Sequence, residues 1–541
     1  MQISNYPFRK LPFSKLFQTY ISDFDQLSDY FSTNPFDTQE LQQKISSYAF
    51  SGDREQTVQI LQQFNDRFDV DEATQKNIKR LKKSDALVIV TGQQLGLYGG
   101  PLYTVLKTIS TIHIARKMER IFDRPVIPVF WLADEDHDYE EIRHVQLLNN
   151  NDEEEVVEFS LPPKNDHLPT VAEMQLPEEL SLVRDRIKEA IYDTDFSEDL
   201  WSLLDQAFGP GKSFLQAFGT FISSLFSRHG LVLAGSNTEQ VKSLTGNIFR
   251  KSITKADEIR DCLQEQSRQV ADNYHQQVTL YDSNLFYLDE ESGRTKISRN
   301  GDGWKTDAGQ EWATAQLVAS IDEEPSRFSP NVFLRPLVQD MLLPTLGFVA
   351  GPGETAYYAQ MKTMYECFDL EMPVIFPRLS ATVIEPAIDR IFNELPFEFH
   401  EYGNRIEDLE SEFVDRTDQH DIEAIFSDWK QKVQKLADPK TEVISDIDPT
   451  LEGAAGKATS AYFGELDKLK GKVYRAVKQQ EQTQLKRIRR IKANLFPEDG
   501  LQEREVAGIF FMNKYGVDLW DKVLQSLDED EIFDSHKLIY L

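Results

Sequence analysis

Short uninterrupted apolar runs and helically spaced apolar residues alternate in the first third of the chain. Ala86–Val90 and Val126–Leu132 are apolar throughout, which is typical of strands buried on both faces. A helix is predicted between them. It is predicted to begin at Pro101, where a missing N–H costs no helical hydrogen bond, and to end at the Asp-Arg-Pro of 123–125. This order predicts a βαβ unit and a parallel sheet. The helically spaced residues are Leu102, Val105, Leu106, Ile109 and Ile112.

The same alternation returns later in the chain. Gly230–Gly235 predicts a third strand, and Leu342–Val349 and Pro373–Phe376 predict two more, with a helix over Thr355–Phe368 between them. Leu280–Lys305 differs, because it combines short alternating runs with an Asn-Gly pair, a pattern that predicts hairpins. The sequence therefore predicts an α/β core with smaller insertions.

Beyond residue 386 the pattern becomes amphipathic and helical on a charged background. Apolar residues recur at helical spacing over 406–436 and again over 466–495. Two long amphipathic helices joined by a loop predict an antiparallel coiled-coil hairpin. The predicted connection contains Pro439, Pro449, Gly453 and Gly456.

These patterns divide the chain into seven predicted parts. They are the first part of the core (1–145), a mainly helical insertion (146–229), the continued core (230–278), a small β-containing insertion (279–325), the last part of the core (326–386), the helical coiled-coil domain (387–500) and a C-terminal segment docking on the core (501–541).

Composition narrows the class of protein. The formal net charge of -31 opposes nucleic acid as a partner, because a phosphate backbone requires a basic surface. Cys262 and Cys367 are the only cysteines, so neither a disulfide framework nor a cysteine zinc site is indicated. Both fall in helical stretches and are expected to be buried, inert thiols. The N-terminus lacks the apolar core of a signal peptide, and no apolar run is long enough to span a bilayer. We expect a cytoplasmic protein without a membrane partner.

A glycine-rich loop follows the first predicted strand. Glycines permit close backbone approach to a ligand, and a helix start offers free N–H groups to an anion. The loop matches neither G-x-G-x-x-G nor a P-loop, so a turn needed only for geometry is the alternative. The candidate binding residues here are Thr91, Gly92, Gln93, Gln94, Gly96, Gly99, Gly100 and Pro101.

An acidic cluster follows the second predicted strand, at the sheet edge where ligands of open α/β folds bind. Clustered carboxylates can hold an ammonium group or a metal, or exchange protons; the alternative is a solvated helix start. His144 lies seven residues beyond His137 and could share a helix face with it, but this indicates a metal only weakly, and no metal site is predicted. The candidate catalytic residues are Asp134, Asp136, His137 and Asp138.

Two arginines and a second glycine turn complete the candidates. Arg335 and Arg378 lie near predicted strand ends, where guanidinium groups would pair with carboxylate or phosphate; structural salt bridges are the alternative. Gly351, Gly353 and Glu354 belong to a tight turn that forms either the other wall of the site or only a turn.

Six motifs lie along almost the whole chain. They are TGQQLGLYGGPLYTVLKTI (91–109), VFWLADEDHDYEEI (129–142), LRPLVQD (334–340), GPGE (351–354), FPRLSATVIE (376–385) and LFPEDGLQER (495–504). In their order and spacing they resemble the cysteine-adding enzyme (cysteine ligase) family of bacillithiol biosynthesis almost from end to end. The resemblance implies a Rossmann-like parallel-sheet core with inserted subdomains, and a coiled-coil domain used for homodimerisation.

The resemblance also implies a reaction. Cysteine would be joined through an amide bond to the amino group of glucosaminyl-malate, with ATP and magnesium expected for carboxylate activation. The glycine loop would hold a phosphate or carboxylate, the acidic cluster would orient or deprotonate amines, and Arg335 and Arg378 would bind the malate carboxylates. The alternatives are a nucleotide- or thiol-metabolite-binding scaffold assembled through its coiled coil, and a nucleotidyltransferase.

Overall fold

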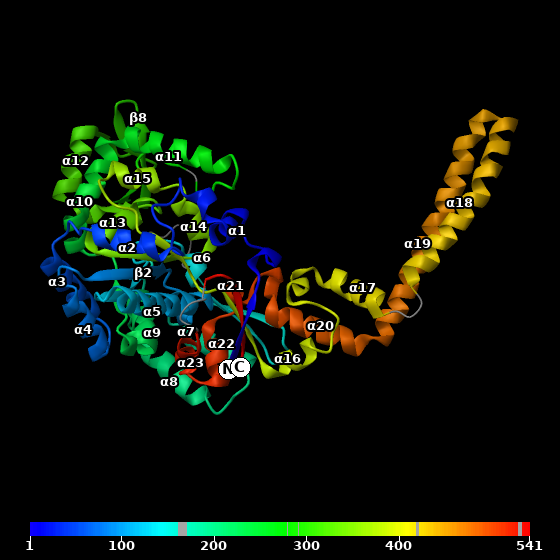
Figure 1. The fold of residues 1–541 in the computed structure, drawn as a ribbon, viewed down its shortest axis with the longest axis horizontal. Coiled ribbons are helices and arrows are strands. Elements are labelled where there is room, and N and C mark those ends of the chain that lie inside the picture. The colour runs from blue at the N-terminus through cyan, green and yellow to red at the C-terminus, as the bar shows by residue number, and fades with distance from the viewer. Residues whose placement is uncertain (161–169, 279, 290, 418–420, 528–532) are drawn as a thin grey trace. The chain divides into compact units, whose positions relative to one another are not determined.

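The structure is a computed structural model that describes residues 1–541 apart from 161–169, 279, 290, 418–420 and 528–532 (Figure 1). The chain forms two compact units. The first comprises Met1–Asn150, Glu154–Thr382 and Glu503–Ile539; the second comprises Asn151–Glu153, Val383–Gln502 and Tyr540–Leu541.

A five-stranded parallel sheet lies at the centre of the first unit. Its strands are β2 (Leu87–Gln93), β3 (Val126–Leu132), β6 (Val232–Ala234), β12 (Thr345–Ala350) and β13 (Val374–Pro377). Their order in space is β13-β12-β2-β3-β6. The chain therefore builds outward from β2 through β3 to β6, then crosses to the other side of β2 for β12 and β13. This order is Rossmann-like, with its topological switch point between β2 and β12, and it confirms the predicted fold class.

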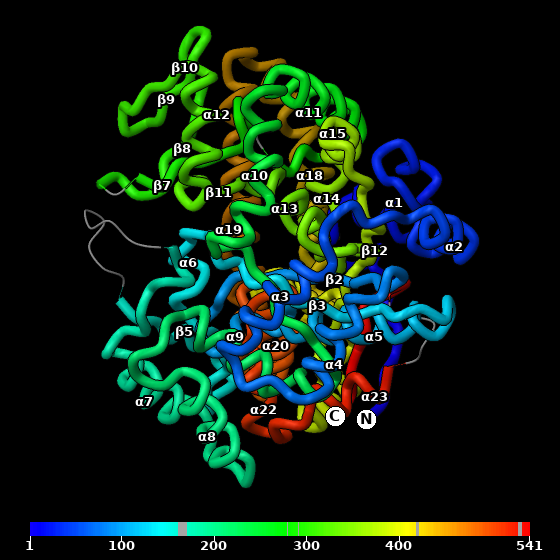
Figure 2. The backbone as a smooth tube through the Cα atoms, turned by 90° about the vertical axis from the view of Figure 1, so that its left-hand side faces the viewer, coloured from blue at the N-terminus to red at the C-terminus, as the bar shows by residue number. Residues whose placement is uncertain are grey.

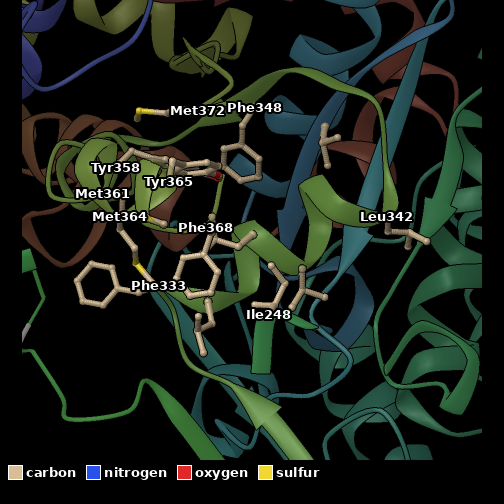
Figure 3. Close-up of a cluster of buried hydrophobic side chains, with 14 of the residues drawn as sticks. Ile248, Phe333, Leu342, Phe348, Tyr358, Met361, Met364, Tyr365, Phe368 and Met372 are labelled. Carbon is tan, nitrogen blue, oxygen red and sulfur yellow. The ribbon is translucent and has the colours of Figure 1, made fainter. Parts of the chain in front are cut away.

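Alternate residues of the sheet pack on opposite faces, because successive side chains of a strand point to opposite sides. Leu87 and Ile89 join one apolar cluster with α5 and α2, whereas Val88 and Val90 join the larger cluster on the other face. Figure 3 shows part of that larger cluster, where Phe348 of β12 lies near Tyr358. The covering helices are α2 (Thr38–Ser47), α3 (Arg54–Asn65), α5 (Tyr103–Phe122), α10 (Glu239–Thr254), α13 (Leu334–Leu342), α14 (Pro352–Tyr358) and α15 (Lys362–Cys367).

An antiparallel sheet interrupts the core between β6 and β12. Its order is β10-β9-β8-β7-β11, and Figure 2 shows β8, β9 and β10 beside α12 (Thr314–Glu323). Asn300 of β8 pairs with Gly303 of β9, and Gly301 between them has a φ of 57°, which glycine adopts without strain. The strands are β7 (Leu285–Asp289), β8 (Gly293–Asn300), β9 (Gly303–Thr306), β10 (Glu311–Ala313) and β11 (Phe328–Pro330).

The segment after β3 differs from the prediction. A helix face shared by His137 and His144 requires a helix that includes both residues. Only the single turn α6 (Tyr139–Ile142) forms, and His144 begins strand β4 (His144–Leu148), which pairs with β5 (Glu154–Glu158). The idea that His137 and His144 share a helix face is therefore wrong, since His137 precedes the turn and His144 follows it. The helices α7 (Leu180–Ala190), α8 (Ser197–Ala207) and α9 (Phe214–Phe226) follow.

Two predicted helix starts are shifted. Pro101 lies two residues before α5 and pairs instead with Ala507 in an isolated antiparallel bridge. The cap of α10 is Thr238, whose hydroxyl accepts from the backbone N–H of Val241. Ser236 and Glu239 form an S-x-x-E pattern, which predicts Ser236 as the cap, but its backbone N–H donates to the Asp134 carboxylate at 3.0 Å. In both cases the residue that the local sequence predicts as the helix start makes a contact with a distant segment instead.

The second unit contains two long helices that run side by side, α18 (Ile422–Ile447) and α19 (Glu452–Gln480) (Figure 1). Their turn is only 448–451, so the predicted connection was too long: Pro439 lies inside α18, and Gly453 and Gly456 lie inside α19. An apolar cluster that includes Ile422, Phe426 and Leu466 holds them together. The antiparallel coiled coil is thus confirmed.

The remaining elements complete the units. Strand β1 (Gln2–Tyr6) pairs with β15 (His536–Tyr540). Among the described helices, none is long and apolar enough to cross a membrane. The other α-helices among the described residues are α1 (Lys15–Ser22), α4 (Glu72–Arg80), α11 (Ala256–Ala271), α16 (Pro386–Phe392), α17 (Ile406–Thr417), α20 (Gln482–Leu495), α21 (Gln502–Glu505), α22 (Gly508–Tyr515) and α23 (Leu519–Ser526).

Candidate active site

A pocket of about 460 Å³ opens at the carboxyl ends of the parallel strands, beside the switch point. The ends of β2 and β3 and the segment after β6 form one side, and residues of α13, α14, β7 and β8 form the other. This is where ligands of open α/β sheets bind. Seven sequence-predicted residues line it: Gly92, Gln93, Gln94, Asp134, Asp136, Arg335 and Glu354.

Buried Lys107 of α5 does not line the pocket, but it contacts two residues that do, Gly92 and Glu354. Its Nζ donates to the carbonyl oxygen of Gly92 at 2.7 Å and pairs with Oε2 of Glu354 at 2.6 Å. The same Glu354 oxygen accepts from the backbone N–H of Gly351 at 2.7 Å. Burial lowers the pKa of Lys107, and Glu354 opposes that shift. One ammonium group thus links the end of β2 to the first turn of α14, across the switch point.

Sequence reasoning missed Lys107 because it lies nearly two turns inside an apolar helix. The signal that could have found it is its spacing: Tyr103 and Lys107 are one turn apart on α5, and Gln93 bonds both. The Gln93 amide donates to the Tyr103 hydroxyl at 3.1 Å and accepts from Lys107 at 3.2 Å. A lysine within a buried helical stripe needs a charged or polar partner.

The second half of the glycine loop does not reach the pocket. A Cβ at Gly96 would approach the Cα of Gly100 to 2.9 Å, and one at Gly99 would approach the Phe221 ring to 2.4 Å. Gly99 and Gly100 also have φ values of 93° and 66°. Close packing within the loop and against α9 therefore explains these glycines. Thr91 likewise has a structural role, because its hydroxyl donates to the Val349 carbonyl oxygen at 3.0 Å.

Replacing Gly99 with alanine is therefore expected to lower stability without direct loss of a ligand contact. The added Cβ meets Phe221, and the positive φ costs an L-residue about 1 kcal/mol or more. A lower thermal midpoint with the KM of the remaining folded protein unchanged is the expected result. A raised KM at unchanged stability would instead place Gly99 in the binding site.

The acidic cluster separates into different environments. Asp134 is buried and accepts from the backbone N–H groups of Ser236 and Asn237, each at 3.0 Å. Burial, reinforced by the neighbouring Glu135 carboxylate, raises the pKa of Asp134 to about 7. Gly235 is required beside it, since a Cβ there would lie 2.3 Å from Oδ2 of Asp134. Asp134 can therefore change its protonation state near neutral pH.

This shift predicts a pH dependence of stability. An unfolded aspartate loses its proton near pH 4, whereas folded Asp134 keeps it until about pH 7, so the folded state binds more protons in this window. The Asp134 contribution to stability must fall as pH rises through the window. The thermal midpoint of the wild type minus that of D134N should therefore decrease from about pH 4 to about pH 8. A difference that is constant or grows with pH would contradict the raised pKa.

Glu135 is the acidic residue that the sequence candidates omitted. It lines the pocket, is 8% exposed, and neither of its carboxylate oxygens has a hydrogen-bond partner among the described residues. Nζ of Lys242 lies 3.5 Å from Oε2, at the limit of a useful contact. A buried carboxylate with open acceptor positions is costly unless a ligand supplies donors. No sequence signal distinguished it from its acidic neighbours.

The other members of the cluster are tied into the protein. Asp136 accepts from the Gln94 amide and from the backbone N–H of His137, the latter at 2.7 Å. Burial lowers the pKa of His137 to about 4, so its ring is neutral at pH 7. Asp138 caps α6 by accepting from the backbone N–H of Glu141 at 3.2 Å. His137 and Asp138 do not line the pocket.

Two guanidinium groups face the pocket from its other side. Arg335 of α13 donates to the Tyr357 hydroxyl at 3.1 Å, and Arg294 of β8 lies 3.9 Å from the Phe286 ring centroid. Arg294 also donates to the Pro330 carbonyl oxygen at 2.8 Å. Within the described residues neither arginine forms a salt bridge, although the charges of Asp136 and Glu135 act on Arg294 and that of Glu354 acts on Arg335. Arg294 was missed because the sequence assigned its hairpin to an insertion and not to the site.

Arg378 does not line this pocket. Its Nη2 lies 2.7 Å from Oε1 of Glu503, and the exposed fractions of the two side chains are 4% and 0%. Burial alone would raise the pKa of Glu503, but the Arg378 guanidinium outweighs it and holds that pKa below its ordinary value. Arg378 therefore forms a structural salt bridge, which was the alternative to a ligand contact at this residue. Gly353, like Gly351, is not among the lining residues.

The pocket consequently has two chemical sides. Glu135 and Asp136 suit an ammonium group or several hydroxyl groups, and Arg294 and Arg335 suit carboxylate or phosphate. Asp134 can exchange a proton near neutral pH. Within the described ranges, no group of three or more metal-ligating side chains is found. Magnesium held mainly by substrate phosphates needs only one or two carboxylates, which Glu135 and its neighbours offer.

These features define a Rossmann-like α/β protein with a charged pocket at its switch point and a coiled-coil unit. The family model described as "Bacillithiol biosynthesis BshC, N-terminal Rossmann-like domain" matches residues 1–379, and "Bacillithiol biosynthesis BshC, C-terminal coiled-coil domain" matches residues 381–541. The chain belongs to the BshC family.

Curated relatives match over almost their whole length. A protein of Salinibacter ruber is 34% identical, with 96% of this chain and 95% of the relative covered. Proteins of Geobacillus kaustophilus (31% identical, 90% and 91% covered) and Chloroherpeton thalassium (30% identical, both chains fully covered) are also similar. All three are named "Putative cysteine ligase BshC".

Proposed function

We propose that this protein is a ligase that joins the carboxyl group of cysteine to the amino group of glucosaminyl-malate, the last step of bacillithiol biosynthesis. Membership of the family and the names of its relatives support a cysteine ligase. The observation that carries the substrate assignment is the pocket itself. It combines a carboxylate without hydrogen-bond partners, Glu135, with two arginines that form no salt bridge among the described residues.

The substrates have groups that match both sides. Cysteine contributes an ammonium group, the sugar contributes an amine and hydroxyl groups, and malate contributes two carboxylates. In this proposal Glu135 and Asp136 bind the ammonium and hydroxyl groups, while Arg294 and Arg335 bind the malate carboxylates. This assignment replaces Arg378, whose guanidinium is already paired with Glu503.

The chemistry needs a neutral amine and an activated carboxylate. An ammonium group has no lone pair, so it must lose its proton before it can attack, and Asp134 with its pKa of about 7 is the proposed acceptor. Magnesium and ATP are the proposed activating reagents. ATP would convert the cysteine carboxylate into a mixed anhydride, from which the amine displaces a phosphate or nucleotide group. Arg294 and Arg335 could also hold a phosphate.

The coiled coil supports a further part of the proposal, a homodimer. Leu436, Val443 and Ile447 of α18 are 72%, 56% and 77% exposed, although they are apolar. A second copy of the hairpin would bury them. Light scattering of the intact protein should give the mass of two chains, and L436E/V443E should give one. A monomeric wild type would remove this part of the proposal.

The test of the reaction is an incubation of the pure protein with cysteine and glucosaminyl-malate, with and without ATP and magnesium, read by mass spectrometry. A product with the mass of both substrates minus water, absent with E135Q, supports the proposal. Pyrophosphate release without amide formation would indicate a nucleotidyltransferase. Substrate binding without any product, in the presence of ATP and magnesium, would favour the scaffold.

A further inference from the structure

The two cysteines of the chain lie next to each other. Cys262 is on α11 and Cys367 is the last residue of α15, yet their Sγ atoms are 3.2 Å apart, with the Cys367 thiol donating to Cys262. They are the only cysteines among 541 residues. The sequence predicted two buried, inert thiols, and nothing in the pattern indicated that segments so distant would bring them into contact.

The surrounding hydrogen bonds keep the two helices in register. Gln266, one turn after Cys262, donates to the Ala359 carbonyl oxygen at 2.6 Å and accepts from the backbone N–H of Thr363 at 2.8 Å. The Thr363 hydroxyl donates to the same Gln266 oxygen at 2.7 Å. Because these contacts lie on both helices beside the sulfur atoms, the thiols are held close and cannot drift apart without breaking them.

The two thiols are not equivalent. Cys262 is partly exposed, whereas Cys367 is buried, 7% exposed. Burial, together with the hydrogen bond to Cys262, raises the pKa of the Cys367 thiol to about 12. An oxidant from solution therefore reaches Cys262 first, since reactivity follows exposure and thiolate character.

We propose that Cys262 and Cys367 form a reversible intramolecular disulfide when the protein meets hydrogen peroxide. The Cys262 thiol loses its proton, its sulfur attacks one oxygen of the peroxide, and the O–O bond breaks. The hydroxide that leaves takes up the released proton, so sulfenic acid and water form. The Cys367 sulfur then attacks the Cys262 sulfur, loses its proton and displaces the hydroxyl group as a second water. The net change is two thiols and one peroxide giving one disulfide and two waters. A dithiol reductant reverses it by thiol–disulfide exchange.

A disulfide between α11 and α15 would restrain the segments that hold one wall of the pocket. Gln360, in the short segment between α14 and α15, accepts from the backbone N–H groups of Gln277 and Val278 at 3.2 and 3.1 Å. Val278 lines the pocket, and so does Tyr357, three residues before Gln360. Gln360 directly precedes α15, and Gln277 and Val278 follow α11, so the two helices that carry the cysteines adjoin the segments that hold this wall. The proposal does not depend on which reaction the pocket catalyses.

The test uses the intact wild-type protein treated with hydrogen peroxide, unfolded in denaturant and exposed to N-ethylmaleimide. The expected result is a monomer with no maleimide attached and a mass about 2 Da below that of the reduced chain, reversed by dithiothreitol. A peptide pair containing both cysteines should appear in the digest. Two maleimide groups on each peroxide-treated chain, stable oxygen addition without a cross-link, or a cross-link only between chains would overturn the proposal.

The single variants test the order of the two steps. In C367S the oxidised Cys262 has no partner, so dimedone should label it as a sulfenic acid. In C262S the buried Cys367 should remain unlabelled at the same peroxide concentration. Equal dimedone labelling of both folded variants would contradict the assignment of Cys262 as the first site of attack.

Discussion

R335M is expected to lower kcat/KM for the ligation about 100- to 1000-fold, because it removes a charge-assisted contact to a substrate anion inside a partly buried pocket. Arg335 is suited to this role by its position at the pocket and by the Tyr357 hydroxyl that orients it at 3.1 Å. R335K should recover only part of the loss, since lysine keeps the charge but not the planar fork. Steady-state kinetics at saturating ATP give kcat/KM for both variants.

The control for this prediction is R250M. Arg250 forms an ion pair with Asp322 at 2.9 Å on the surface, where both side chains are more than two-fifths exposed. Removing it should leave kcat/KM within about two-fold, because exposed pairs contribute little and this one does not line the pocket. If R335M, folded as judged by its thermal midpoint, retained wild-type kcat/KM, the assignment of Arg335 to substrate binding would be wrong.

E503Q is expected to destabilise the first unit by about 3–5 kcal/mol, because it leaves the Arg378 guanidinium buried without a counter-charge. Glu503 Oε1 also accepts from the Ser380 hydroxyl at 2.9 Å, and Oε2 accepts from the backbone N–H of Ala381 at 2.7 Å. The amide of glutamine would turn an N–H toward at least one of these donors. The measurement is the midpoint of urea unfolding.

Two further variants separate the charge from the packing. Lys82 and Glu55 form an ion pair of 2.6 Å with exposed fractions of 49% and 63%, so K82M should cost less than about 1 kcal/mol. R378M/E503M, which removes both buried charges, should be less destabilised than the sum of R378M and E503M. Additive losses would mean that the buried pair has no special coupling.

The fold was largely predictable from the sequence, and the candidate site only in part. The buried strands and the coiled coil follow from local periodicity, which the sequence displays directly. Gly92, Gln93 and Gln94 reach the pocket as their place after β2 suggested. Gly99 does not, because it packs against the Phe221 ring, and a glycine needed for packing looks the same in sequence as one needed for binding.

The residues that the sequence did not predict were missed for one physical reason. Arg294 reaches the pocket from an inserted hairpin, and Glu135 differs from Asp136 in the partners that folding gives it. Lys107 contacts two residues that line the pocket, Gly92 and Glu354. Each depends on a tertiary contact between distant segments. The same holds for Cys262 and Cys367, and for Arg378, whose partner Glu503 lies far along the chain.

The pairing of β2 with β12 has a consequence for how the protein becomes active. Val88 pairs with Thr345, and about 250 residues of chain, which include β3 and β6, lie between these two strands. Such a pairing has a very high contact order, so loop closure delays it until most of the first unit has been synthesised and has condensed. Residues on both sides of the β2–β12 pairing line the pocket. A nascent or truncated chain can therefore contain β2, its glycine loop and the acidic cluster in native form and still possess only half a site.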